Sequence, residues 1–162
     1  MRIEFLADYP HFAEPLARYH HEEWKALLPL WSYEAALAEL QDHTQPRTIP
    51  TTMVALEGDQ LLGSASLVHE DPTEEDLPGL ASLSPWLASV FVLPGQRGRG
   101  VGSALVEAVV AQAQALNVPR LYLFTAGQEA FYARLGWSVS ARVDHHGQPG
   151  VVMVKELLVL GS

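Results

Sequence analysis

The sequence predicts an α/β fold with a mixed central sheet of six to seven strands and helices on both faces. Short apolar or alternating segments typical of strands are interleaved with longer segments of helical periodicity. Glycine or proline lies at almost every boundary between them. The 162 residues fit one ordinary domain, and the content of 48% hydrophobic and 18% charged residues is typical of a globular chain. We therefore expect a single domain over residues 1–162.

The first 50 residues are predicted to form a short strand and two helices. Arg2–Leu6 has the composition of a strand, and Tyr9–Leu28 has a helical period. Pro15 interrupts this pattern and indicates that the helix begins near Glu14. Ser32 is placed to cap the start of the second helix.

The next segment is expected to supply the middle of the sheet. Thr51–Leu56 and Gln60–Val68 are two strand-like runs, and the Glu57-Gly58-Asp59 turn between them indicates a hairpin. A long acidic loop is expected over His69–Ser84. The nearly all-apolar run Trp86–Leu93 then fits a buried central strand.

The last 60 residues continue the alternation of helices and strands. Gly136 is placed to end a short helix. The predicted elements are a helix over Val101–Leu116, a strand over Arg120–Phe124, a helix over Gln128–Leu135, and a closing hairpin of Trp137–Val143 and Val151–Leu158.

Composition excludes several classes of protein. The chain has no cysteine, which rules out disulfides, thiolate nucleophiles and cysteine-based zinc sites. We find no signal peptide pattern in residues 1–30 and no apolar run of 18 residues, so we expect a cytoplasmic protein without a membrane partner. The net charge of −9 argues against a nucleic-acid partner. The pairs His20-His21 and His145-His146 lack metal-ligand spacing, so no metal is expected.

A glycine-rich segment between a predicted strand and a predicted helix is the strongest candidate for a binding site. Gly98, Gly100 and Gly102 alternate with other residues, and Arg97 and Arg99 add positive charge. Such glycines let the backbone approach a ligand closely, and the start of the following helix offers free N–H groups and the positive end of its dipole. The segment therefore predicts a phosphate or pyrophosphate ligand.

Two common phosphate motifs do not fit this segment. A P-loop requires a lysine after the glycines, and none follows them. A dinucleotide-binding fingerprint requires a third glycine where this chain has Ser103 or Leu105. A tight glycine turn with two solvated arginines is the structural alternative.

Two motifs, in the order in which they follow one another along the chain, resemble those of the GNAT superfamily of N-acetyltransferases. The first is Arg97-x-x-Gly100-x-Gly102 after the strand-like run Trp86–Pro94, and the second is Phe131-Tyr132-Ala133-Arg134-Leu135-Gly136-Trp137, roughly 30 residues later. The resemblance covers residues 51–158 as an acetyl-CoA-binding core, and residues 1–50 fit as variable helices on the substrate side. It implies a GNAT-like acyl-CoA N-acyltransferase fold.

The resemblance also implies where acetyl-CoA binds. The pyrophosphate is expected on the segment formed by Arg97, Gly98, Arg99, Gly100, Val101, Gly102 and Ser103. The pantetheine arm is expected to pair with the backbone at Phe91 and Val92, between two strands that splay apart.

Acetyl transfer requires a neutral amine and a proton for the departing thiolate. The resemblance places Tyr132 beside the sulfur as the proton donor; a packing role is the alternative. The base is left open between loop residues such as Glu70 and Asp71, the helix residues Glu22 and Glu23, and a chain of water molecules.

Charge distribution favours a cationic acceptor. Residues 1–94 contain 15 acidic and 4 basic residues, a net charge of −11, whereas residues 95–162 carry +2. The predicted function is transfer of acetyl from acetyl-CoA to a primary amine, namely a small cationic metabolite. A protein lysine or N-terminal acetyltransferase and a non-catalytic acyl-CoA-binding regulatory module are the alternatives. A homodimer is a further possibility that the sequence leaves open.

Overall fold

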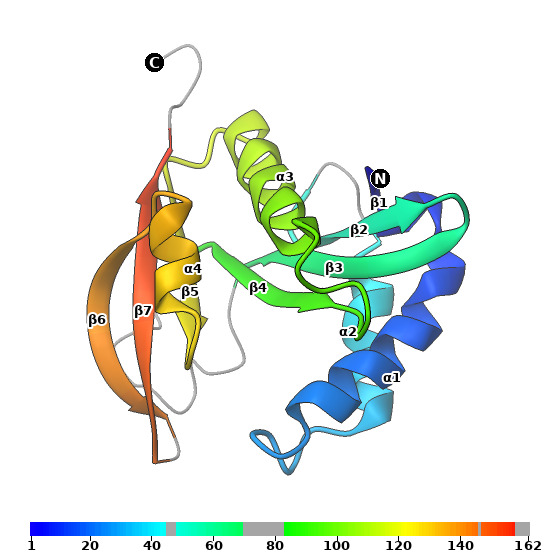
Figure 1. Ribbon diagram of the computed structural model, residues 1–162, viewed down its shortest axis with the longest axis horizontal. Helices are drawn as coiled ribbons and strands as arrows, with labels where there is room; N and C mark the ends of the chain where they lie inside the picture. The colour runs from blue at the N-terminus through cyan, green and yellow to red at the C-terminus, as the bar shows by residue number, and fades with distance from the viewer. Residues whose placement is uncertain (45–47, 70–82, 146, 158–162) are drawn as a thin grey trace. The chain divides into compact units, whose positions relative to one another are not determined.

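A computed structural model of the chain describes residues 1–44, 48–69, 83–145 and 147–157. Two short 3-10 turns, Leu6–Asp8 and Pro10–Phe12, lie between β1 and α1. The described elements (Figure 1) are β1 (Arg2–Phe5), α1 (Ala13–Trp24), α2 (Tyr33–Asp42), β2 (Thr51–Glu57), β3 (Gln60–Val68), β4 (Trp86–Val92), α3 (Val101–Ala115), β5 (Arg120–Thr125), α4 (Glu129–Arg134), β6 (Ser138–His145) and β7 (Gln148–Glu156).

The seven strands formed by the described residues make one mixed sheet in the order β1-β2-β3-β4-β5-β7-β6. β4 runs parallel to β5, with Trp86 opposite Tyr122. The pairs β1–β2, β2–β3, β5–β7 and β6–β7 are antiparallel. A parallel pair needs a long crossover connection, and α3 lies in that connection. The prediction of a mixed sheet with helices is confirmed.

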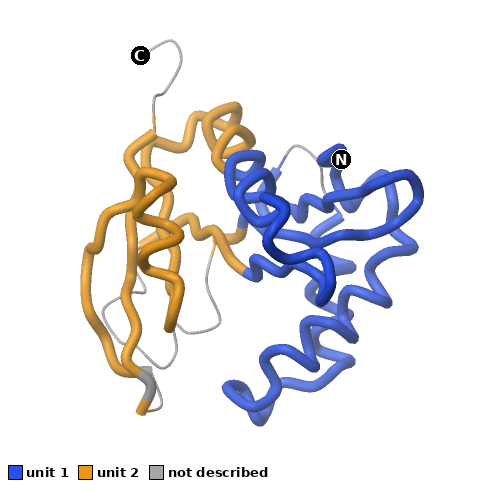
Figure 2. The backbone as a smooth tube through the Cα atoms, in the orientation of Figure 1, with its two compact units in different colours: residues 1–67, 89–109 blue, residues 68–88, 110–162 orange. Residues whose placement is uncertain are grey.

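The chain divides into two compact units, drawn in different colours in Figure 2. Unit 1 consists of residues 1–67 and 89–109, and unit 2 of residues 68–88 and 110–162. The single domain expected from the sequence stays a prediction. In unit 1, the buried core is formed by Leu6, Ala13, Leu16, Ala17, Ala36, Leu40, Val54, Leu56 and Leu61. In unit 2, a core cluster is formed by Val68, Trp86, Ala88, Tyr122 and Val152.

In unit 1, α1 and α3 cover opposite faces of β3. Neighbouring strand residues point to opposite faces. The Ser64 hydroxyl oxygen lies 3.0 Å from His20 Nε2 on α1. A Cβ built on Gly63 would instead lie 3.2 Å from Leu105 on α3. At β3, therefore, helices lie on both faces as predicted.

The ends of α1 and α2 follow the local sequence signals. α1 begins at Ala13, so Pro15 lies in the first turn, where its missing N–H has no helical partner to lose. The helix ends at Trp24, earlier than the predicted Leu28. The N–H groups of Leu27 and Leu28 both bond to the Trp24 carbonyl, which tightens the chain just before a proline. Ser32 caps α2 as predicted, since its hydroxyl accepts a 3.0 Å bond from the Ala35 N–H.

The closing hairpin is longer than predicted. β7 begins at Gln148, and Pro149 and Gly150 lie inside it, although both residues usually interrupt strands. The ring of Phe124 explains the glycine, because a Cβ at Gly150 would lie 2.6 Å from the ring atom Cζ. β7 pairs with β6 through Asp144 opposite Pro149.

Candidate functional site

The predicted phosphate-binding segment connects β4 to α3. Gly98 and Gly100 both have φ of +80°, a left-handed conformation that side chains disfavour. A Cβ at either glycine would have no atom within 4 Å, so this side of the loop is open. α3 begins at Val101, which places Gly102 and Ser103 in its first turn, and that turn contains no acidic residue. The geometry therefore presents helix N–H groups beside an open backbone.

Arg97 lies over the end of β4. Its Nε donates a 2.9 Å hydrogen bond to the carbonyl oxygen of Val92. Its Nη2 lies 3.6 Å from the Glu23 carboxylate on α1, and its Cζ lies 5.8 Å from the centroid of the Phe91 ring. Arg97 thus connects the glycine segment to both β4 and α1.

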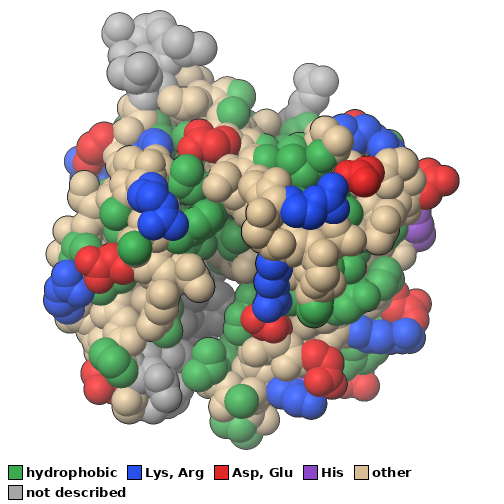
Figure 3. All heavy atoms as spheres, in the orientation of Figure 1, with side chains coloured by type: hydrophobic (Ala, Val, Ile, Leu, Met, Phe, Trp, Pro, Cys, Tyr) green, Lys and Arg blue, Asp and Glu red, His purple; other side chains and the backbone are tan. Residues whose placement is uncertain are grey.

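Arg99 is held in a similar way by another carboxylate. Its Nη2 donates a 2.9 Å bond to Glu57 at the end of β2, and its Nη1 donates to the side chain of Gln96. Basic and acidic side chains lie side by side at several places on the surface shown in Figure 3. Both arginines of the segment are therefore partly neutralised by carboxylates, so they add less positive charge than the sequence indicated.

Phe91 and Val92, the residues expected to pair with pantetheine, lie at the carboxyl end of β4. The Phe91 ring is 4% exposed and packs on α1, with centroid distances of 5.7 Å to Tyr19, 5.7 Å to His20 and 6.1 Å to Trp24. This aromatic contact fixes α1 against the end of the strand.

Ser89 introduces an irregularity in β4 that the sequence did not indicate. Its φ is +56°, which is uncommon for a residue other than glycine, asparagine or aspartate. One left-handed residue inside a strand bends it and disturbs its pairing, and such bulges are frequent beside active sites. Ser89 lies two residues before Phe91, so the irregularity falls next to the predicted pantetheine position.

Tyr132, the predicted proton donor, lies on α4 in unit 2. The residue is 7% exposed, and its ring packs edge-on against Phe131 at 4.9 Å and Trp137 at 6.2 Å. Burial raises the pKa of its hydroxyl to about 12. The group therefore stays protonated at neutral pH and is a hydrogen-bond donor.

Residues 14–137 match the acetyltransferase (GNAT) family. The chain belongs to this family. The match includes both the glycine segment and the Phe131–Trp137 segment, and it confirms the predicted family and enzyme class. GNAT enzymes use acetyl-CoA as a co-substrate, which confirms the predicted acetyl donor.

Solved structures support the GNAT fold. An aminoglycoside 6'-N-acetyltransferase in complex with coenzyme A is 15% identical, with 98% of each chain covered and a TM-score of 0.75. A ribosomal-protein-alanine N-acetyltransferase from Brucella melitensis is 20% identical, with 97% of this chain and 100% of that chain covered and a TM-score of 0.74. YncA from Salmonella typhimurium, with its cofactor acetyl-CoA, is also 20% identical, with 100% and 96% covered and a TM-score of 0.70. A search of curated proteins gives no match.

In this GNAT chain, the sheet face under α1 carries a buried polar network. His20 is hydrogen-bonded to Ser64, and burial lowers its pKa to about 3, with a smaller contribution from His43. His43 Nδ1 lies 3.1 Å from Thr52 Oγ1, which lies 2.8 Å from Ser66 Oγ. Sequence analysis gave these residues no role. Within the described ranges, no cluster of three metal-ligating side chains occurs.

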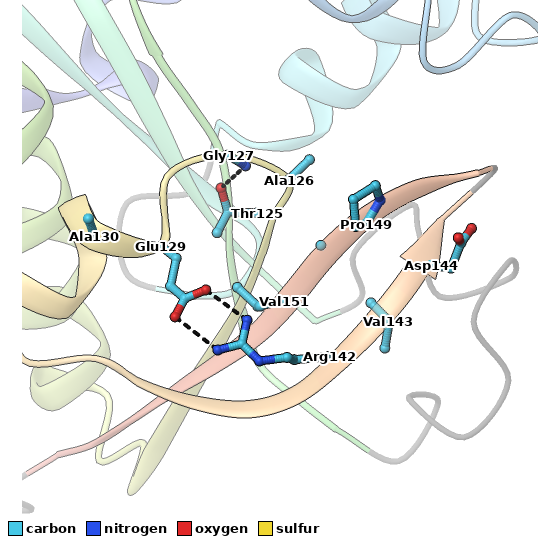
Figure 4. Close-up of a pocket in the computed structure, with 11 residues that line it drawn as sticks. Thr125, Ala126, Gly127, Glu129, Ala130, Arg142, Val143, Asp144, Pro149 and Val151 are labelled. Carbon is cyan, nitrogen blue, oxygen red and sulfur yellow. Dashed lines mark hydrogen bonds and ion pairs between the residues drawn. The ribbon is translucent and has the colours of Figure 1, made fainter.

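A hollow of about 640 Å³ lies in unit 2 between the β5–α4 connection and the β6–β7 hairpin. Figure 4 shows the Arg142 guanidinium aimed at the Glu129 carboxylate along one side of it. The two bonds of this fork are 2.9 and 3.2 Å long, and they lower the pKa of Glu129. Thr125 supports the loop by accepting a 3.1 Å bond from the Gln128 N–H. No sequence signal indicates this pair, because its members belong to no motif and are 13 residues apart.

The residues considered as the catalytic base differ in where the structure places them. Glu70 and Asp71 lie outside the described residues. Glu22 is paired at 3.0 Å with Lys25, the residue that follows the end of its own helix. Glu23 is the nearer to the glycine segment, because it pairs with Arg97.

No helix in the described part of the chain is long and apolar enough to span a membrane.

Proposed function

We propose that this GNAT enzyme transfers the acetyl group of acetyl-CoA to a primary amine, and that the amine is a small cationic metabolite. The observation that carries the proposal is the open glycine segment, with Gly98 and Gly100 left-handed, between the end of β4 and the start of α3. This arrangement suits a pyrophosphate held by backbone N–H groups.

In this proposal, residues 97–103 bind the pyrophosphate, and the backbone of Phe91 and Val92 pairs with the pantetheine arm. The Val92 carbonyl already accepts a bond from Arg97. A carbonyl oxygen has two lone pairs, so the arm either shares this acceptor or replaces the guanidinium.

The reaction forms a C–N bond between the amine and the acetyl carbon and breaks the C–S bond of the thioester. The amine loses a proton to a base or to water, and the thiolate gains one. Tyr132 is the proposed donor of that second proton. Its pKa of about 12 exceeds that of a free thiol, about 8.5, so complete transfer to a solvated thiolate would be uphill by roughly 5 kcal/mol. The phenol therefore acts by a hydrogen bond that strengthens as the thiolate forms, with proton transfer favoured where the sulfur is desolvated too.

Charge supports the choice of a cationic acceptor. The net charge of −11 over residues 1–94 attracts cations to this part of the chain. Similar structures are named as enzymes that acetylate aminoglycosides, and one is named for a ribosomal protein. The second name keeps a protein N-terminus as the other candidate acceptor. A homodimer and a cytoplasmic location stay predictions.

An amine panel tests the proposal. Free thiol released from acetyl-CoA is followed with small diamines and polyamines, with monoamines and with a basic peptide. We expect the highest kcat/KM with a small cationic amine and a decrease in that value as ionic strength rises. A preference for the peptide would favour protein acetylation. Coenzyme A binding without thiol release from any amine would support the regulatory module instead.

A further inference from the structure

Both arginines of the glycine segment are held by carboxylates from other elements of unit 1. Arg97 pairs with Glu23 on α1, and Arg99 pairs with Glu57 on β2. A phosphate ligand of this segment must therefore compete with carboxylates for the same guanidinium groups. The two pairs differ in strength, because Arg99 and Glu57 form a 2.9 Å hydrogen bond, whereas Arg97 Nη2 lies 3.6 Å from the Glu23 carboxylate.

We propose that Glu23 is a positioning residue that competes with the phosphates of the donor for Arg97, so that this carboxylate lowers the affinity of the enzyme for coenzyme A. The proposal rests on the proposed function, since it requires phosphate to bind at the glycine segment. Donor binding then separates Arg97 from Glu23, so the ion pair between the glycine segment and α1 depends on whether the donor is bound.

The geometry makes this exchange easy for Arg97. Its side chain is 53% exposed and that of Glu23 is 43% exposed, so water screens their attraction. Exposed ion pairs contribute roughly 0.2–1 kcal/mol, whereas a guanidinium on phosphate makes shorter, charge-assisted bonds. A phosphate within reach of Arg97 is therefore expected to displace the Glu23 carboxylate from the guanidinium.

Glu23 is poorly placed to follow Arg97 when the arginine moves. Residues on either side of it in α1, Tyr19, His20 and Trp24, pack on the Phe91 ring, and His20 is also bonded to Ser64. These contacts hold the helix, whereas the Arg97 side chain is 53% exposed and its hydrogen bond to the Val92 carbonyl is made by Nε, not by the Nη2 that faces Glu23. Donor binding thus leaves the Glu23 carboxylate without its partner rather than moving the helix.

Glu22 provides a matched control. It precedes Glu23 on the same helix and carries the same charge, but it pairs with Lys25. Replacing either glutamate with glutamine removes one negative charge from nearly the same place. Only the Glu23 substitution removes a competitor for Arg97.

The test is calorimetric titration of coenzyme A into the wild type, Glu23→Gln, Glu22→Gln, Arg97→Gln and the Glu23→Gln/Arg97→Gln double variant. We expect Glu23→Gln to lower Kd about 1.5–5-fold, which is the ion-pair range above expressed as an affinity ratio. Glu22→Gln should leave Kd almost unchanged, and Arg97→Gln should raise it. In the Arg97→Gln background, Glu23→Gln should have no further effect.

Three results would overturn the proposal. These are an unchanged or higher Kd for Glu23→Gln, an equal decrease for Glu22→Gln, and a persistent Glu23 effect without Arg97. The second and third would assign the change to the general acidic field of the protein. If the wild type itself fails to bind coenzyme A, the proposed function fails, which is a separate outcome.

Discussion

His20 Nε2 lies 3.0 Å from the hydroxyl oxygen of Ser64, in an interface where the two residues are 3% and 0% exposed. The pair connects α1 to β3, and the ring of His20 itself packs against Phe91 at a centroid distance of 5.7 Å. Because burial lowers the pKa of His20 to about 3, the imidazole is neutral at physiological pH. The position of α1 beside the donor segment therefore depends on an uncharged histidine.

The stability of the protein should fall in mild acid because of this histidine. The folded-state pKa of about 3 lies below the unfolded value of 6.5, so between these values the unfolded chain binds more protons. The contribution of neutral His20 to the free energy of unfolding is complete above pH 6.5. This contribution is lost as the pH falls towards 3, at up to about 1.4 kcal/mol per pH unit. The half-buried His43, whose pKa is also lowered by partial burial, acts in the same direction. Urea unfolding at several pH values measures the slope.

Two variants separate the role of His20 from that of the remaining titrating groups. His20→Gln keeps a hydrogen-bonding side chain but removes the titration, so its slope between pH 6.5 and 4 should be smaller than in the wild type. His11→Gln, at an exposed position, should keep the wild-type slope. Equal slopes for all three proteins would show that His20 does not limit acid stability.

Gly63→Ala should destabilise unit 1 and impair donor binding together. The added Cβ would overlap the carbonyl oxygen of Phe91 and lie 3.2 Å from the Cα of Val92, so β4 would have to move. Overpacking of this kind costs about 1–3 kcal/mol. Gly127→Ala is the control, since a Cβ there meets nothing within 4 Å. Thermal unfolding and coenzyme A titration are measured for both variants. The same melting temperature and the same Kd for Gly63→Ala and Gly127→Ala would show that β4 does not approach Gly63 closely.

Tyr132→Phe should reduce turnover and leave binding nearly intact. The ring keeps its contacts with Phe131 and Trp137, but the hydroxyl proton is lost. Loss of general acid catalysis typically costs roughly 10²–10⁴-fold, and kcat should fall within or somewhat below that range. KM for acetyl-CoA should change little. Because the pKa is about 12, no limb of the wild-type pH profile between pH 6 and 9 should come from this phenol.

Tyr122→Phe serves as the control for loss of the hydroxyl from another largely buried tyrosine, since Tyr122 is 9% exposed and lies on β5. A wild-type kcat for Tyr132→Phe would leave water as the proton donor. A Tyr132→Phe protein that does not fold would assign the hydroxyl to packing.

Much of the fold was predictable because local signals agreed with the final structure. Ser32 at the start of α2, the Gly58 turn between β2 and β3, and Gly136 after α4 all act where the sequence placed them. The glycine segment was recognisable for the same reason, since its residues are consecutive and its conformation is local. The longer hairpin was missed, because the reason for Gly150 in β7 is the ring of Phe124. This ring leaves no room for a Cβ at Gly150, but the two residues are far apart in the sequence.

The contacts around the candidate site were not predictable. Arg97 and Glu23 are paired although 74 residues separate them, and no spacing rule relates them. Ser89 adopts a left-handed conformation without the glycine or asparagine that usually signals it. Such features arise from tertiary packing, which a single sequence does not reveal.

The proposed donor site depends on the left-handed glycines before α3 binding the phosphates of acetyl-CoA. Titration of coenzyme A into Gly100→Asp and Gly58→Asp tests this binding. Both glycines have positive φ, +80° and +60°, and neither has an atom within 4 Å of an added Cβ, so each substitution adds one negative charge at an open position with positive φ. We predict that Gly100→Asp binds coenzyme A at least about 100-fold more weakly, because the new carboxylate repels phosphate and its side chain blocks close approach to the backbone N–H groups, where charge-assisted bonds contribute roughly 1.5–3 kcal/mol each. Gly58→Asp should bind like the wild type, and an unchanged Kd for Gly100→Asp would show that the phosphates bind elsewhere.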